Sequence, residues 1–336
     1  MKEEKISLKN RWNKFRTRIR KHAVPRVLLR VLLVLVAALI VFQATLVVLV
    51  LSGAFGKLPA YAELTAIQNP VASEVYSADS VLMGKYYIRN RQYMKPGEIP
   101  PALPDALVAT EDHRFYEHHG IDLRSLGRVF IKSILMGDRG AGGGSTITQQ
   151  LAKNLYPRQD NGFLTLPVNK VKEMATAVRI EKLYSKDEIL ELYLSTVPFG
   201  GDTYGIKTAS LRYFNKNPEA LTTEESALLV GMLKATDLYN PAKHLDEALT
   251  RRNVVLGQMV KYNYLDSSAG DSLQRLPVRL KYSPLPHFAG IAPYFREYMR
   301  KELEGWCRTH KNSKGEPYDL YTDGLKIYTT IDSCLQ

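Results

Sequence analysis

The sequence predicts a mainly α-helical domain that carries one small β-hairpin and follows a single membrane-spanning helix. Three observations support this fold class: a charge-free apolar run near the N-terminus, helix-start signals between residues 104 and 264, and a β-type pattern at residues 73–88. The chain has 336 residues, 45% hydrophobic and 24% charged, which excludes a mainly disordered protein. Its two cysteines, Cys307 and Cys334, are too few for a disulfide framework or a zinc-thiolate site.

The predicted transmembrane helix is Val31–Leu51. These 21 residues contain no charge, and at a rise of 1.5 Å per residue they match a bilayer core of about 30 Å. The basic tail before them, residues 1–30, holds eleven Lys and Arg against two Glu and therefore carries nine of the twelve net positive charges. The positive-inside rule predicts a cytoplasmic N-terminus, one membrane crossing and an external C-terminal body.

Two other interpretations of this N-terminal region are a cleaved signal peptide and a nucleic-acid-binding tail. Ala60-Tyr61-Ala62 has small residues at the spacing of a signal-peptidase site, so a cleaved signal peptide is the alternative to an anchor. The basic segment and the apolar run are both longer than the corresponding regions of a usual signal peptide, which favours the anchor. Nucleic acid is not an expected partner, because topology and anionic lipid explain juxtamembrane Lys and Arg.

The external part is predicted to contain a connector, a hairpin and a long helical region. Residues 52–72 are rich in Gly and Pro and indicate the connector. Segments 73–77 and 81–88 are rich in β-branched and aromatic residues and flank the turn formers Ala78-Asp79-Ser80, which predicts a hairpin. We therefore place one external domain at residues 73–270.

Helix starts in this domain are marked by capping boxes, in which a hydroxyl and a carboxyl or amide side chain satisfy free backbone donors. The pattern occurs at Thr146-x-x-Gln149, Ser185-x-x-Glu188 and Thr222-x-x-Glu225. A helix is therefore expected to begin directly after each of the three hydroxyl residues.

The first segment with candidate chemistry is Glu111–Asp122. Glu111 ends an apolar helical run, where aromatic and apolar neighbours can suit a carboxylate to general acid or base work; a solvated helix end is the plain alternative. His113, His118 and His119 suggest a metal site, but their spacing puts them on different sides of a helix, so ligation is not expected.

The second segment is Gly140–Asn154, where glycines lead into a capped helix start. Free backbone N–H groups at such a start attract phosphate, and Lys153 lies four residues beyond Gln149 on the same face. The order of residues is not that of a Walker loop. A flexible turn into an ordinary helix is the alternative, but together the two segments pair a carboxylate with a pyrophosphate-type anion site.

These segments resemble the first two signature motifs of the peptidoglycan glycosyltransferase (transglycosylase) domain of class A penicillin-binding proteins, glycosyltransferase family 51. The matching residues of the first are Glu111-Asp112 with Phe115, His118 and Gly120, and those of the second are Gly144–Leu151 with Lys153-Asn154. Further matches follow in order: Lys170-x-x-Glu173 with Glu181 and Tyr184–Leu194, Phe199-Gly200 with Gly205, Ala209 and Tyr213-Phe214, and Leu221–Leu233 with Tyr239-Asn240-Pro241. The resemblance covers about residues 73–265 and implies a bilobal, lysozyme-like, mainly helical fold.

The resemblance implies an enzyme of the bacterial inner membrane that polymerises lipid II and releases undecaprenyl pyrophosphate. Glu111 matches the family's catalytic base, and Glu173 its second essential glutamate at the phosphate site. The implied substrate-binding residues are Arg128, Ser145, Thr146, Gln149, Lys153 and Lys170. No metal ligand is assigned, although a divalent cation, Mg or Mn, is a conceivable cofactor. The implied partners are lipid II, the growing glycan strand, the membrane and other cell-wall synthesis proteins.

Three departures from the family pattern weaken the expected set of cations around the phosphate more than the assignment of the base. Asn169 stands before Lys170 where the family usually has Arg, and Thr236 stands where proline is common. Lys153 and Glu173 are also about four residues farther apart than in compact members, with Pro157 and Pro167 in the insert, so whether Arg158 replaces a further phosphate-binding arginine is open.

Residues 271–336 are interpreted as a linker toward a transpeptidase domain. The stretch Gly324–Asp332 alternates like a strand, and no Ser-x-x-Lys motif of an acylating serine occurs in the 336 residues. No transpeptidase activity is therefore expected of this sequence, which is either a fragment of a bifunctional protein or a natural chain without the second domain.

Two other functions compete with polymerisation. A lysozyme-like hydrolase also uses one glutamate but gains nothing from a pyrophosphate site beside a membrane anchor. A catalytically inactive scaffold that binds lipid II is conceivable because of Asn169, yet a scaffold does not need Glu111, Glu173, Lys153 and Arg128 as a set.

Overall fold

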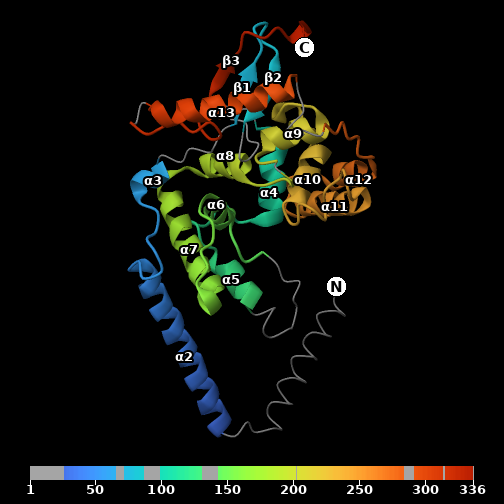
Figure 1. Cartoon of the computed structure of the whole chain (residues 1–336). Helices are drawn as coiled ribbons and strands as arrows, with labels where there is room; N and C mark the ends of the chain where they lie inside the picture. The colour runs from blue at the N-terminus through green and yellow to red at the C-terminus, as the bar shows by residue number, and fades with distance from the viewer. Residues whose placement is uncertain are drawn as a thin grey trace. The chain divides into compact units, whose positions relative to one another are not determined.

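The structure is a computed structural model that describes residues 26–65, 72–86, 99–130, 143–201, 203–283, 291–312 and 315–335. The chain forms two compact units: residues 1–58 with 161–172, and residues 59–160 with 173–336. Both contain mainly helices, and the second adds a three-stranded sheet (Figure 1). The mainly helical fold class with a small sheet and an apolar N-terminal helix is confirmed.

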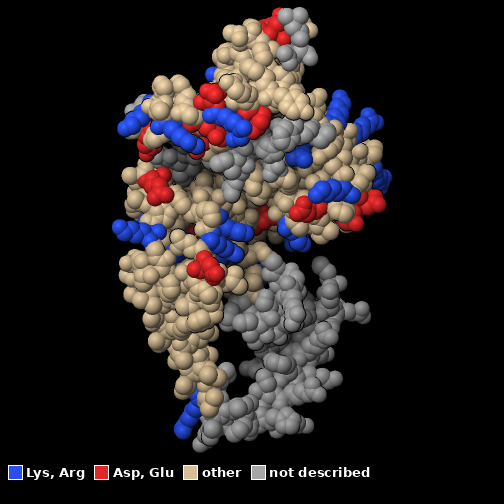
Figure 2. Space-filling model, in the orientation of Figure 1, with Lys and Arg blue, Asp and Glu red and all other residues tan. Residues whose placement is uncertain are grey.

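The first unit is built on α2, Arg26–Leu51. Within it, Leu33–Leu51 has a mean hydropathy of 2.9 and is the one helix in the described part of the chain that is long and apolar enough to cross a membrane. The only charged residues of α2 are Arg26 and Arg30, in the first turns, and Figure 2 shows blue at this end of the helix. Leu46 and Val50 pack against Val168 of helix α7, Thr165–Leu183, and Leu164 of the 3-10 helix η2, Gly162–Leu164, joins them.

The helical core of the second unit surrounds α4, Ala102–Glu111, which packs against two later helices. These are α10, Thr223–Met232, and α11, Leu245–Lys261, with α12, Ser267–Arg275, beside them (Figure 1). Helix α6, Ile147–Leu155, packs against α8, Lys186–Thr196. Further helices of this unit are α3, Tyr61–Thr65, α5, Leu123–Phe130, α9, Ile206–Phe214, and the 3-10 helix η3, Pro218–Ala220.

The predicted helix starts are found where the sequence places them. Ser185 and Glu188 form a complete capping box at α8, and the Glu225 carboxylate accepts a 3.0 Å hydrogen bond from the Thr222 backbone N–H at α10. Thr146 caps α6 by accepting from Gln149 N at 3.2 Å. The other hydrogen bond of a capping box, from the Thr146 backbone to the Gln149 side chain, is replaced, because that side chain donates to the Gly120 carbonyl instead.

The end of the predicted connector joins the helical core. Leu64 is fully buried there, Arg179 donates to the Pro59 carbonyl at 2.6 Å, and Tyr184 donates to the Leu64 carbonyl at 2.6 Å. Residues 59–65 are therefore fixed on the second half of α7, which belongs to the same unit.

The predicted hairpin forms strands β1, Ser73–Tyr76, and β2, Leu82–Tyr86, which pair antiparallel. The alternating C-terminal segment supplies β3, Lys326–Tyr328, which pairs parallel with the other edge of β1. Helix α13, Pro293–Thr309, packs on this sheet around Val75 and Met83 (Figure 1). The hairpin of predicted domain 73–270 thus shares a sheet and a core with the predicted linker 271–336. A last 3-10 helix, η4, is Ser333–Leu335.

Candidate active site

Glu111 is the last residue of α4 and lies half-buried at the wall of a cleft of about 510 Å³. The helix before it is anchored by Leu103 and Leu107, both fully buried, so its last turn has a fixed position. The cleft is lined from four places, namely residues 109–113, part of α5 and the residue before it, residues 143–146 ahead of α6, and one face of α11 with Lys234. The structure therefore brings the two chemical segments predicted from sequence into one cleft.

One oxygen of Glu111 is held by α6. Gln150 Nε2 donates to Glu111 Oε2 at 2.9 Å. Gln149, the neighbour that the sequence analysis selected for the substrate, is fully buried, and its Nε2 donates to the Gly120 carbonyl at 3.1 Å. Of the two glutamines, the one that the prediction omitted is the one that contacts the candidate base.

Asp112 fixes the start of α6 beside Glu111. Its buried Oδ2 accepts the Ile147 backbone N–H at 3.1 Å and lies 2.9 Å from His118 Nε2. An ionised carboxylate only accepts, so His118 is the donor of that second bond. His113 instead stacks on Tyr262 with ring centroids 4.5 Å apart. His113 and His118 thus face different partners.

Gly120 brings the loop after α4 into contact with two helices. Its φ is +86°, and a Cβ built there would lie 2.9 Å from the Ala177 backbone carbonyl carbon, so only glycine fits without strain. Its carbonyl accepts from Thr146 Oγ1 at 2.8 Å as well as from Gln149. The side chains of Thr146 and Gln149 are therefore used to position the loop, while Ser145 and Thr146 both line the cleft.

Four cationic side chains line the cleft that contains Glu111: Arg128, Lys234, Arg251 and Lys261. Arg128 is exposed on α5, and its Nη2 lies 3.4 Å from Ser125 Oγ. The Arg251 guanidinium lies 5.9 Å from the Tyr239 ring centroid, and its Nε is buried without a hydrogen-bond partner among the described residues. Three carboxylates also line the cleft, but Asp112 is held by His118 and Asp122 by Arg114. The four cations therefore favour an anionic ligand.

Three of these cations were missed from sequence, although a signal for two of them was present. Residues 251, 254, 258 and 261 follow the spacing of three and four that puts side chains on one face of a helix, and all four line the cleft. The pattern in α11 joins two basic residues to Val254 and Gln258, so it also fits an ordinary amphipathic helix.

Burial and neighbouring charge shift two titratable groups of the cleft. Burial, then the charges of Arg128 and Arg114, lower the pKa of His113 from 6.5, which favours its neutral form. Burial raises the pKa of Asp122, but hydrogen bonds from Arg114 and Ser125 outweigh it and hold the pKa well below 3.8. Asp122 also accepts the Ser125 backbone N–H at 3.1 Å, so its ionised form fixes the start of α5.

Four predicted site residues do not line this cleft: Gln149, whose contacts are given above, and three more. Lys153 is exposed in the last turn of α6. Glu173 is buried in α7, and its Oε1 lies 2.9 Å from Arg158 Nη2. Lys170 belongs to the first unit, where the neighbouring Asn169 donates to the Thr165 carbonyl of its own helix at 2.7 Å. The basic residue of the insert, Arg158, therefore contacts the second glutamate.

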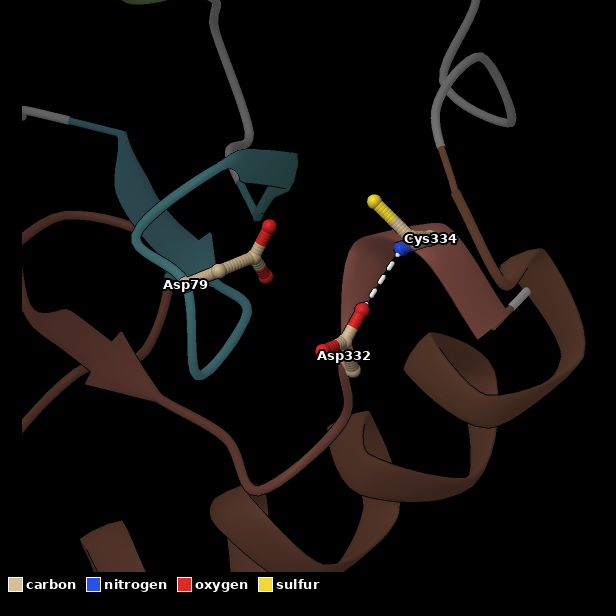
Figure 3. Close-up of side chains that lie close together, drawn as sticks. All are labelled: Asp79, Asp332 and Cys334. Atoms are coloured by element: carbon tan, nitrogen blue, oxygen red, sulfur yellow. Dashed lines mark hydrogen bonds between the residues drawn. The ribbon is translucent and has the colours of Figure 1, made fainter.

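A group of possible metal ligands lies far from Glu111 in sequence. Asp79, Asp332 and Cys334 bring one ligand atom each to within 4.8 Å of the others, and Figure 3 shows Asp79 reaching from the hairpin turn toward the C-terminal segment. All three are exposed, and Ser333 N donates to Asp79 Oδ1 at 3.0 Å. These contacts tie the hairpin to the chain after β3.

A carboxylate that shares one cleft with several cations suits a group transfer in which a base acts on one reactant and cations stabilise an anionic group of the other. The family model described as Transglycosylase matches residues 79–260, more than half of the chain. The chain belongs to the transglycosylase family of glycosyltransferases, and the resemblance found from the motifs is confirmed.

The chain is similar to several penicillin-binding proteins. It is 37% identical to penicillin-binding protein 1A of Escherichia coli over 83% of this chain and 31% of that protein, and 38% identical to penicillin-binding protein 1F of Bacillus subtilis over 79% and 35%. A crystal structure of penicillin-binding protein 1A from Haemophilus influenzae aligns with a TM-score of 0.45 and 24% identity over 80% of this chain and 28% of that one. The chain spans about a third of the length of the curated relatives it matches.

Proposed function

We propose that this chain is a membrane-anchored peptidoglycan glycosyltransferase. It joins lipid II units into β-1,4-linked glycan strands and releases undecaprenyl pyrophosphate. The observation that carries the proposal is the position of Glu111 in the same cleft as Arg128, Lys234, Arg251 and Lys261, in a chain of the transglycosylase family. Its proposed partners are lipid II, the growing strand, the membrane and other cell-wall synthesis proteins.

The reaction needs a base on one side and stabilisation of negative charge on the other. Glu111 removes the proton of the acceptor's 4-hydroxyl as that oxygen attacks the anomeric carbon of the donor. The bond between that carbon and the pyrophosphate oxygen breaks, and the electron pair leaves with the pyrophosphate. Cations of the cleft stabilise this charge, Arg by forked contacts and Lys as a point charge.

The other predicted substrate residues have different degrees of structural support. Ser145 and Thr146 line the cleft at the start of α6, where backbone N–H groups favour an anion. Binding of the pyrophosphate by Gln149, Lys153 and Lys170 stays a prediction without support from the cleft. Glu173 forms an ion pair with Arg158, and we propose that it supports the phosphate site by holding this arginine.

A divalent cation, Mg or Mn, also stays a prediction. In the described ranges no group of three or more candidate metal ligands includes Glu173, and its carboxylate pairs with a guanidinium. The residues there do not form a metal site by themselves, so we assign no reaction step to a cation.

The proposed location is the bacterial inner membrane, with a cytoplasmic N-terminus and the catalytic domain on the external or periplasmic side. Support comes from helix α2, which is long and apolar enough to cross a bilayer, and from the basic tail that precedes it. Attachment to the membrane suits a lipid-linked substrate.

The decisive experiment incubates detergent-purified chain with labelled lipid II and separates the products by gel. We expect a muramidase-sensitive polymer from the wild-type chain and none from Glu111→Gln, which keeps the shape of the side chain but removes the base. Lipid II that binds to the wild-type chain without being extended would contradict the proposal and favour a scaffold.

A further inference from the structure

Glu111 is linked to a third helix through Gln150. While Gln150 Nε2 donates to Glu111 Oε2, its Oε1 accepts a 3.1 Å hydrogen bond from the hydroxyl of Tyr193 on α8. Tyr193 is 1% exposed, and the described residues provide no other hydrogen bond to its hydroxyl. A chain of two partly buried hydrogen bonds thus runs from α8 through α6 to the end of α4.

The direction of these hydrogen bonds is determined by the ionised carboxylate. A carboxylate only accepts, so the NH2 end of the Gln150 amide has to face Glu111 and its oxygen has to face Tyr193. The tyrosine hydroxyl is then the donor. Burial, and secondarily the charge of Glu111, raise the pKa of Tyr193 well above 10, so this donor keeps its proton at any pH at which the enzyme would work.

The two bonds leave the two carboxylate oxygens of Glu111 in different situations. Oε2 is occupied by Gln150, whereas no hydrogen bond to Oε1 is found within the described residues. A reversed amide would turn the Gln150 oxygen toward Glu111, where the two would repel each other and Oε2 would lose its donor. The Tyr193 hydroxyl could then accept from the Gln150 NH2 group, but its own O–H would lose its acceptor, which opposes the reversal.

We propose that Tyr193 is a positioning residue for Glu111: acting through Gln150, it holds Oε2 and leaves Oε1 as the oxygen that takes the proton of the acceptor hydroxyl. This inference rests on the proposed glycosyltransferase function. Tyr193 touches no reacting atom, and it acts by fixing the amide that in turn fixes the base. Neither Tyr193 nor Gln150 belongs to the residues selected from sequence as part of the site.

The test measures initial rates of lipid II polymerisation by Tyr193→Phe against pH. We expect kcat to fall about tenfold with KM within about twofold, because the loss of one buried hydrogen bond changes the base and not substrate binding. The acidic limb of the pH–rate profile should move to higher pH, because a carboxylate with a poorly held donor takes up a proton more readily.

The matched control is Tyr213→Phe. Tyr213 is also fully buried, and its hydroxyl donates to the Phe199 carbonyl at 3.0 Å, with no hydrogen bond to Glu111 or Gln150. Both variants remove one buried hydroxyl, so their melting temperatures should fall by similar amounts. Only Tyr193→Phe should move the pH profile.

A double-mutant cycle tests whether Tyr193 acts through Gln150. Gln150→Leu removes both hydrogen bonds, so adding Tyr193→Phe to it should change kcat by less than about twofold. Full multiplication of the two losses, or an unchanged kcat and pH profile in Tyr193→Phe, would overturn the proposal while leaving the glycosyltransferase function intact. A wild-type chain that makes no polymer would overturn the function, and this inference with it.

Discussion

Replacing Asp112 by Ala is expected to destabilise the helical domain by about 4 kcal/mol. The Asp112 carboxylate accepts from His118 Nε2 and from the Ile147 backbone N–H, and both donors are buried. Each buried donor left without a partner costs about 1–3 kcal/mol. The ring cannot compensate through its other nitrogen, since His118 Nδ1 is buried and already has no partner among the described groups.

Thermal unfolding of the detergent-purified chain, followed by far-UV circular dichroism, measures this loss. For a domain of roughly 250 residues, about 4 kcal/mol corresponds to a melting temperature lowered by about 10 °C. Asp237→Ala is the control, because the Asp237 side chain is 84% exposed and its 3.5 Å pair with Lys243 is worth at most about 1 kcal/mol. If both variants melt within 2 °C of each other, the carboxylate does not fix the start of α6.

Three further outcomes are expected. Gly120→Ala should cost about 2–4 kcal/mol of stability in thermal melts, because the new Cβ meets the Ala177 backbone at a position with positive φ. The control is Gly257→Ala inside α11, where a Cβ meets nothing within 4 Å, and it should be neutral or stabilising. The pKa of His113 is lower in the folded state than 6.5, so the unfolded chain binds the proton more readily and stability should fall as pH drops below about 6.5. Thermal melts between roughly pH 7 and 5 should show a smaller fall in His113→Phe. Arg251→Gln should weaken lipid II binding several-fold and make it less dependent on salt, as titrations at two ionic strengths would show; an unchanged salt dependence would contradict a role in anion binding.

The helical fold could be predicted because its signals are local. The capping residues at positions 185 and 222, and the charge-free run that became most of α2, act within a few residues of themselves. The pairing of β3 with β1 could not be predicted in the same way. Glu74 pairs with Lys326 across about 250 residues of chain, and alternation along a strand specifies neither its partner nor its direction.

The candidate site was predicted in part, and the errors of selection follow from helix geometry. Gln149 and Gln150 are neighbours in one motif, but successive residues of an α-helix point about 100° apart. Gln149 consequently turns into the core toward Gly120, while Gln150 turns toward Glu111. A motif identifies which residues matter without separating those that support the backbone from those that contact the base. Whether a side chain supports the backbone or contacts the base depends on which neighbouring helix it faces. For Gln150 the neighbour is α8, whose Tyr193 donates a hydrogen bond to its side chain.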